Sequence, residues 1–414
     1  MSNWSGLFVQ QRVLVLLDDL NYKHSHSLFF SSLQTRGYSL DFKRLDGKAL
    51  QLRDWDDWLY EHVILLASAT APGGAVNAVS LAEFVDSGRN VLVVVDPKVS
   101  DEIREFVSEC GVDLEAPGTF VTDHFSYVVS GEPDHTLLAA SHLVDAPAVF
   151  GSQQVTDPVL FRGVGMSISP ESQLVTKLLS ADNTSLSQVP YKSLADSGLL
   201  AGIDIGLVAI MQARNNARVA VAGSIEMFSN RFFRTHIETG QGSRHPKTGN
   251  AQFCGSLARW VFQEVGVLRA ANLRHHHVGS SEQQPEVYRI KDQLQFSLDI
   301  QELTLGGWRP YRADDVQLEF VMLDPYIRTT LEHNKKGTFF TTFTVPDVYG
   351  IFKFVIDYRH LGYSYLELSQ QIPVRPFKHN EYERFLPAAY PYYSSVFSVM
   401  AGFFLLLSLV LYHK

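Results

Sequence analysis

The chain has 414 residues, of which 45% are hydrophobic and 19% are charged. This length gives room for two or three folded domains, and the composition excludes both a mini-protein and a chain that is disordered throughout. With 35 Lys and Arg residues against 44 Asp and Glu residues, the formal net charge is −9. Because a net negative charge repels phosphate backbones, we expect no nucleic-acid partner.

The first part of the chain alternates between apolar runs and amphipathic segments. The apolar runs are continuous, as in strands buried on both faces of a sheet, and they lie at 12–17, 63–67, 91–95, 207–212 and 218–223. The intervening segments have helical spacing, and several of them end at glycine. This order predicts a doubly wound α/β domain, with a parallel sheet covered by helices, over residues 12–270.

The hydrophobic period changes after residue 270. Residues alternate between apolar and polar at 317–323 and at 352–358, which is the period of strands with one buried face. Turn residues separate the successive short runs. This pattern predicts an antiparallel β-sandwich over residues 285–376, followed by a juxtamembrane linker over 377–394.

The end of the chain predicts one transmembrane helix. Residues 395–412 contain no charge and no proline. At about 1.5 Å per residue they would form a helix about 27 Å long, close to the thickness of the hydrocarbon layer of a bilayer. Tyr390, Tyr392 and Tyr393 precede this span, where amphipathic rings settle among lipid headgroups.

Small residues recur at every fourth position at the start of the predicted span. Ser394, Ser398 and Gly402 therefore share one helix face. Such a face lets a second helix approach closely in lipid, so we expect it to pack on another membrane subunit. The alternative is that Gly and Ser are simply common in membrane helices.

The orientation of the chain is open at the level of composition. Residues 1–11 lack the basic n-region and the long apolar run of a secretory signal peptide. Taken alone, this pattern favours a tail-anchored cytosolic adaptor. Two glycosylation sequons, at Asn3 and Asn183, could be used only in a secretory lumen, although such triplets also arise by chance.

No familiar catalytic motif is present. The sequence lacks the phosphate loop, the dinucleotide fingerprint and the nucleophile elbow, so we expect no catalytic residue, no cofactor and no metal. An α/β enzyme that uses Asp18 or Asp96 remains as an alternative, because Asp18 follows the first strand at the edge where open α/β sheets bind ligands.

Three other groups of residues favour structural roles. The triplet 275–277, which is His-His-His, is expected to be a solvated interdomain loop. The segment 54–58 is expected to form a short helix with its tryptophans packed inward, rather than a metal site. Cys110 and Cys254 are expected to be buried free thiols, although their spacing leaves a disulfide open.

Several strings along the chain resemble one known family. They are Leu14–Asp18, His26–Phe30, Leu160–Met166, Gln212–Val219, Arg259–Phe262, Gln317–Val321, Pro346–Gly350 and Tyr382–Phe385. Together they resemble, in order and over residues 12–412, the 48 kDa subunits of the eukaryotic oligosaccharyltransferase complex.

The resemblance implies a type I membrane protein of the endoplasmic reticulum with its large domain in the lumen. It implies an α/β domain similar to glutamine amidotransferases without their active site, and an accessory role in transferring an oligosaccharide from dolichyl pyrophosphate to Asn in Asn-x-Ser/Thr. The implied partners are a catalytic multispanning subunit, a ribophorin-type subunit and small membrane subunits. The glycines at 163, 165 and 350 are then expected to serve tight turns.

Two features depart from the family pattern. The cleavable signal expected of the family is missing, which favours an incomplete or processed start of the chain. The chain also stops at Lys414, where relatives carry a longer charged tail. Without a di-lysine retrieval signal, we expect retention to come from assembly.

Overall fold

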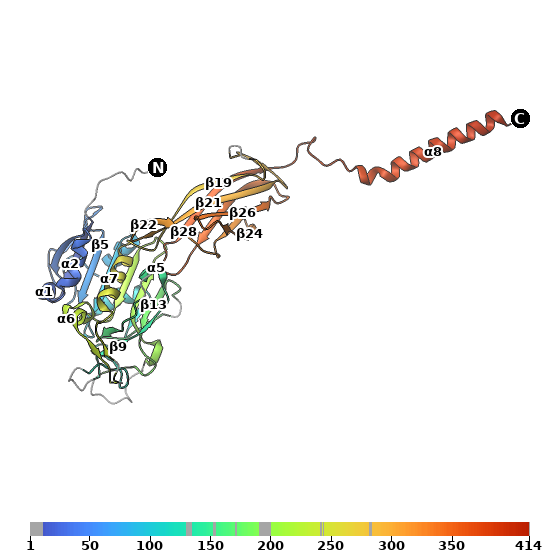
Figure 1. The fold of residues 1–414 in the computed structure, drawn as a ribbon. Coiled ribbons are helices and arrows are strands. Elements are labelled where there is room, and N and C mark those ends of the chain that lie inside the picture. Colours follow the sequence, from blue (N-terminus) through green and yellow to red (C-terminus); the bar gives the residue numbers. More distant parts are fainter. Residues whose placement is uncertain are drawn as a thin grey trace.

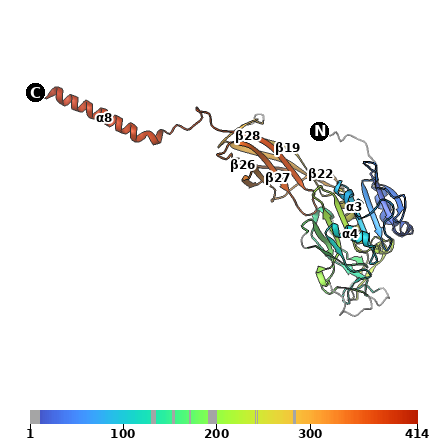
Figure 2. The same ribbon diagram turned by 180° about the vertical axis from the view of Figure 1, so that it is seen from behind.

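A computed structural model describes residues 11–129, 135–151, 155–169, 172–189, 200–240, 242, 244–280 and 284–413. In these residues the chain forms an α/β domain, a β-sandwich and one long helix (Figure 1). The sandwich lies between the α/β domain and the helix. Figure 2 shows the same order from behind, with the helix beyond the far end of the sandwich.

A mixed sheet forms the centre of the α/β domain. Its main path follows the order β10-β13-β15-β16-β6-β5-β1-β2, with β7 (Val112–Leu114) and β12 (Met166–Ile168) attached beside it. The strands of the path are β1 (Arg12–Leu17), β2 (Ser39–Arg44), β5 (His62–Ala67), β6 (Asn90–Val95), β10 (His142–Leu143), β13 (Val175–Ser180), β15 (Gly206–Gln212) and β16 (Arg218–Ala222).

Only half of this sheet is parallel. Strands β2, β1, β5, β6 and β16 run parallel, whereas β15 pairs antiparallel with both β16 and β13. The expectation of a wholly parallel sheet was therefore wrong for its second half. The physical reason is the short link 213–217 between β15 and β16, because only antiparallel neighbours can be joined without a long crossover.

Helices cover both faces of the sheet, as the doubly wound prediction requires. On one face α2 (Ser27–Thr35) and α7 (Asn250–Val261) enclose a core with the sheet. On the other face α3 (Ala78–Asp86) and α4 (Asp101–Glu109) enclose a second core. The shorter elements are α1 (Tyr22–Ser25), α5 (Pro147–Phe150), α6 (Asn230–Arg234), β8 (Phe120–Thr122), β9 (Leu138–Ala140), β11 (Val159–Phe161), β14 (Leu186–Gln188), β17 (Ile237–Glu238) and β18 (Arg244–His245).

The aspartate- and tryptophan-rich segment is a β-hairpin and not a helix. It comprises β3 (Arg53–Asp54) and β4 (Asp57–Trp58), and the expectation of inward-facing tryptophans fails at Trp55, which is 94% exposed. Trp55 has φ 54, a left-handed conformation that suits a tight hairpin turn. Trp58 does pack on the domain, with its ring 5.2 Å from that of Phe84.

The β-sandwich consists of two five-stranded sheets. One sheet contains β19 (Val267–His277), β21 (Gln293–Thr304), β22 (Gly307–Pro310), β25 (Glu332–His333) and β26 (Thr338–Thr344). The other contains β20 (Tyr288–Arg289), β23 (Gln317–Val321), β24 (Pro325–Thr330), β27 (Gly350–Tyr358) and β28 (Leu366–Arg375). All pairs are antiparallel except β20 with β28, and the aromatic core between the sheets includes Phe296, Phe320, Phe339 and Phe354.

Polar contacts hold the two domains together. The amide nitrogen of Gln212, at the end of β15, donates to the carbonyl oxygen of Tyr363 at 2.7 Å, and the Tyr365 backbone N–H donates to the side-chain oxygen of Asn216 at 2.7 Å. Both Tyr residues belong to the loop between β27 and β28. The short link between β15 and β16, which contains Asn216, therefore also contacts the sandwich.

Glycine at 163 lets two distant parts of the backbone pack closely. A Cβ atom at Gly163 would overlap the carbonyl oxygen of Gly223, which belongs to the segment after β16. The backbone N–H of Val164 donates to that carbonyl at 2.9 Å, so the two chains touch directly. No sequence pattern indicated this contact, because a long-range approach leaves no local signal.

Candidate functional site: the membrane helix and its tether

The C-terminal helix α8 (Leu386–Tyr412) has the length and composition of a membrane span. It has 27 residues, its most apolar stretch of 18 residues has a mean hydropathy of 2.2, and none of its residues is buried against the rest of the chain. It begins at residue 386, so residues 386–394 continue the helix instead of forming linker. At about 1.5 Å per residue its length is about 40 Å, which exceeds the hydrocarbon layer and leaves the first turns at the headgroups.

The three small residues lie on one exposed face of α8. The hydroxyl of Ser394 donates to the Pro391 carbonyl at 2.9 Å, and that of Ser398 donates to the Ser395 carbonyl at 2.9 Å. A Cβ at Gly402 would have no heavy atom within 4 Å. The hydroxyl groups are thus satisfied inside the helix, and the face is free for close packing.

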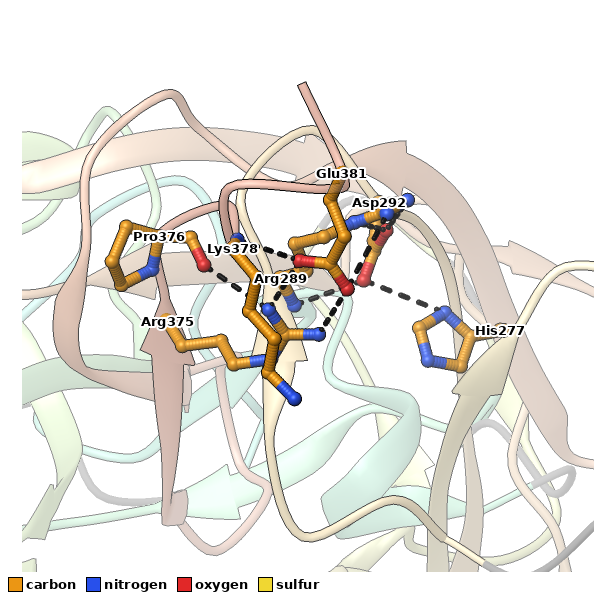
Figure 3. Close-up of polar contacts among 7 residues, drawn as sticks. All are labelled: His277, Arg289, Asp292, Arg375, Pro376, Lys378 and Glu381. Carbon is orange, nitrogen blue, oxygen red and sulfur yellow. Dashed lines mark hydrogen bonds and ion pairs between the residues drawn. The ribbon is translucent and has the colours of Figure 1, made fainter. Parts of the chain in front are cut away.

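The segment that joins the sandwich to α8 folds back on the sandwich. We call residues 376–385 the tether. The guanidinium of Arg375, the last residue of β28, donates two hydrogen bonds to the carboxylate of Glu381, at 2.6 and 2.8 Å. The same carboxylate accepts from the backbone N–H of Lys378 at 2.8 Å (Figure 3). We call this pair of side chains, Arg375 and Glu381, the clasp.

The clasp belongs to a larger network of charges. Arg289 donates from its backbone N–H and its side chain to Asp292, with a shortest contact of 2.9 Å. Arg289 also lies 4.0 Å from Glu381, and His277 lies 3.9 Å from Asp292 (Figure 3). The hydrogen bonds from Arg375 lower the pKa of Glu381 to about 2. The tether is therefore held by ionised groups at neutral pH.

The carboxyl edge of the sheet, where a catalytic centre would lie, carries a carboxylate pair. Asp18 follows β1 and Asp96 follows β6. The hydroxyl of Ser68 donates to Asp96 at 3.1 Å, and burial raises the pKa of Asp96. Among the residues that the structure describes, no cluster of three or more His, Cys, Asp or Glu side chains could hold a metal.

Both cysteines are buried free thiols, as expected. Cys110 follows the last residue of α4, and burial raises its pKa to about 12. Cys254 lies inside α7, and burial raises its pKa as well. Since the thiolate is the reactive form of cysteine, burial disfavours the reactive form of both side chains.

The histidine triplet is part of strand β19, and the expectation of a solvated loop was wrong. His275 is only 2% exposed, its Nδ1 lies 3.0 Å from the Tyr288 hydroxyl, and its ring stacks on Phe354. Alternation along a strand explains the difference, since His275 faces the core while His276 faces outward.

The two candidate glycosylation sites differ in what the structure says of them. Asn3 lies outside the described residues. Asn183 is exposed in a turn, and the hydroxyls of Thr184 and Ser185 both donate to Asp123, at 2.6 and 2.9 Å. Because these bonds hold the sequon in the folded chain, a transferase would have to recognise it before this segment folds.

The sequence offered no signal for the clasp. Arg375 was expected at the end of the sandwich and Glu381 in the juxtamembrane linker over 377–394, because a salt bridge between two charges six positions apart has no periodic pattern. The small-residue face of α8, in contrast, follows directly from helical spacing.

These features define a membrane-anchored α/β protein with a β-sandwich next to its anchor. Residues 6–264 match the family model described as OST48, N-terminal domain, and residues 275–414 match the OST48 middle domain.

Two named relatives are similar to this chain along nearly its whole length. A protein of Arabidopsis thaliana is 48% identical over 98% of this chain and 93% of its own length, and one of Danio rerio is 42% identical over 95% and 90%. Both are named dolichyl-diphosphooligosaccharide–protein glycosyltransferase 48 kDa subunit. The chain belongs to this family of 48 kDa subunits of the oligosaccharyltransferase complex.

The solved structures to which this chain is similar are distant. A glutamine amidotransferase from Thermotoga maritima has 9% identity and a TM-score of 0.30, covering 51% of this chain and 74% of its own. A carbohydrate deacetylase, Agd3, has 12% identity and a TM-score of 0.36, covering 68% and 35%. The fold class follows from the strand order given above. Neither of these two structures supports an inference about function.

Proposed function

We propose that this chain is a non-catalytic subunit of the oligosaccharyltransferase complex, which moves an oligosaccharide from dolichyl pyrophosphate to Asn in Asn-x-Ser/Thr. Its role is to brace and stabilise the complex and to help position the donor. The proposed partners are the catalytic multispanning subunit, a ribophorin-type subunit and small membrane subunits. No cofactor is part of this proposal.

One observation supports the non-catalytic role above all. Among the described residues, the carboxyl edge of the sheet carries the carboxylates of Asp18 and Asp96 and the hydroxyl of Ser68. The thiols of Cys110 and Cys254 lie elsewhere, and burial raises their pKa values. Glycosyl transfer to an amide needs a centre that binds pyrophosphate and activates the acceptor nitrogen. The net charge of −9 also disfavours pyrophosphate binding on this chain.

The proposal is tested by two carboxamide substitutions. A complex that carries Asp18→Asn together with Asp96→Asn should glycosylate an acceptor peptide at the rate of the unchanged complex. The exposed Asp56→Asn variant is the matched control. A strong loss of activity in the double variant, with the complex still assembled, would show that this edge takes part in the reaction.

The proposed topology places the α/β domain and the sandwich, expected over 12–270 and 285–376, in the lumen of the endoplasmic reticulum. In that single-pass type I arrangement, residue 413 lies on the cytosolic side. The competing function is a tail-anchored cytosolic adaptor. Protection of the large domain from added protease in sealed microsomes supports the luminal arrangement, and its digestion would support the adaptor.

A further inference from the structure

Exposed apolar side chains gather at the end of the sandwich from which the tether leaves. The exposed fractions are 90% for Leu323, 45% for Tyr326, 66% for Tyr349 and 63% for Ile351. We call these four residues the rim. A soluble surface scatters such side chains singly, whereas a cluster at one end indicates an interaction surface.

The strand pairing places the rim residues next to one another. Strand β27 begins at Gly350, opposite Val374 near the end of β28. Strand β23 ends at Val321, which pairs with Pro325 of β24 across the turn that carries Leu323. A Cβ at Gly350 would contact the sulfur of Met322, so the two turns meet at this end of the sheet.

The tether fixes how far this end can lie from α8. Because the clasp holds Glu381 against Arg375, only residues 382–385 remain between the clasp and the first residue of α8. Five extended steps of the chain from Glu381 to Leu386 span at most about 17 Å. The first turns of α8 carry Tyr390, a side chain suited to the headgroup level, so the clasped end of the sandwich lies within about 17 Å of the start of the membrane helix.

The groups around the rim suit lipid headgroups. The Arg289 guanidinium lies 5.2 Å and the Lys291 ammonium 6.0 Å from the ring centre of Phe377, in the tether. Lys291 also pairs with Asp347 at 3.0 Å. Aromatic and aliphatic side chains beside cations are the composition of protein surfaces that lie in a bilayer interface.

We propose that the rim lies against the surface of the same bilayer that α8 spans, with Leu323 and Ile351 among the lipid headgroups. The sandwich then has two contacts with the membrane, one through its helix and one through its end. This proposal requires that α8 span the bilayer, and it holds on either side of the membrane, so its failure is separate from failure of the proposed function.

The test uses the full chain, alone, in phosphatidylcholine nanodiscs. Leu323→Cys and Ile351→Cys are each labelled with an environment-sensitive fluorophore. Leu305→Cys is the matched control, since Leu305 is 67% exposed and follows the last residue of β21. At about 3.3 Å per residue, that end of β21 lies about 36 Å from its first residue, Gln293, which is at the tether end of the sandwich. The native cysteines are buried and stay unlabelled.

We expect quenching by doxyl-labelled lipid to be several-fold stronger at 323 and 351 than at 305, with the reverse order for aqueous iodide. Glu381→Gln, which weakens the clasp, should reduce the lipid quenching at both rim positions and leave position 305 unchanged. Equal iodide quenching at all three positions would overturn the proposal. If the rim positions become protected from iodide only after partner subunits are added, and show no lipid quenching, the rim binds a protein partner. That result would also overturn the proposal.

Discussion

The indole Nε1 of Trp260, in the last helix of the α/β domain, donates a hydrogen bond of 2.7 Å to the carbonyl oxygen of Gly362 in the sandwich. Beside it, the fully buried Arg218 donates to the carbonyl oxygens of Trp260, Val265 and Gly266, at 2.6 to 2.7 Å, and its guanidinium lies 4.7 Å from the Trp260 ring centre. The Arg218 bonds satisfy the carbonyl groups where α7 ends and the chain enters β19, and the Trp260 bond links the two domains.

Replacing this tryptophan tests the domain junction. Trp260→Phe removes the donor and leaves the Gly362 carbonyl buried without its partner, so we expect a loss of about 1 to 3 kcal/mol in the free energy of unfolding. Denaturant unfolding measures this change. Trp308→Phe is the control, because Trp308 is 41% exposed and should cost at most about 0.5 kcal/mol. Equal costs for the two variants would contradict the role given to Trp260.

The predictions from sequence succeeded where a local period reports on burial. The apolar runs at β1, β5 and β6 predicted buried strands, and every residue from Val13 to Leu17 is fully buried. The alternation of Phe352, Phe354 and Ile356 predicted the inner face of β27, and these side chains are at most 1% exposed.

The predictions failed where distant segments decide the structure. His275 is buried because Tyr288 and Phe354 lie around it, and neither contact leaves a trace in the triplet itself. The antiparallel pairing of β15 with β16 depends on chain connectivity rather than on composition. The clasp needs two charges brought together by a turn, which no residue pattern specifies.

The clasp should depend on pH in a defined direction. The pKa of Glu381 is lowered from its usual 4.5 to about 2, chiefly by the hydrogen bonds from Arg375. Because the folded pKa is the lower one, the stabilisation by this carboxylate is complete above about pH 4.5 and is lost as the pH falls through about 2. The carboxyl-carbon chemical shift of Glu381, followed by NMR, measures the midpoint.

A matched variant separates the clasp from general acid effects. In Arg375→Gln the Glu381 carboxyl loses its main partner, so its midpoint should rise towards the usual value. An unchanged Glu381 midpoint in Arg375→Gln would disprove the clasp.

The buried thiols should be unreactive in the native chain. Burial raises the pKa of Cys110 to about 12 and raises that of Cys254 too, so almost no thiolate is present at neutral pH. We expect no labelling by a maleimide under native conditions, and labelling of both cysteines in denaturant without a reductant. Leu305→Cys gives the positive control for an exposed thiol. Absence of labelling in denaturant would instead indicate a disulfide.

The small-residue face of α8 should mediate helix packing within the complex. Gly402→Leu adds a branched side chain where the face is open, and this separates any helix packed against it. We therefore expect Gly402→Leu to reduce co-purification of at least one membrane subunit, while Gly402→Ala, which keeps a small side chain, has little effect. Leu406→Ala, on the next turn, controls for a change in bulk alone. If every subunit co-purifies with Gly402→Leu as it does with the unchanged chain, this face does not hold a partner helix.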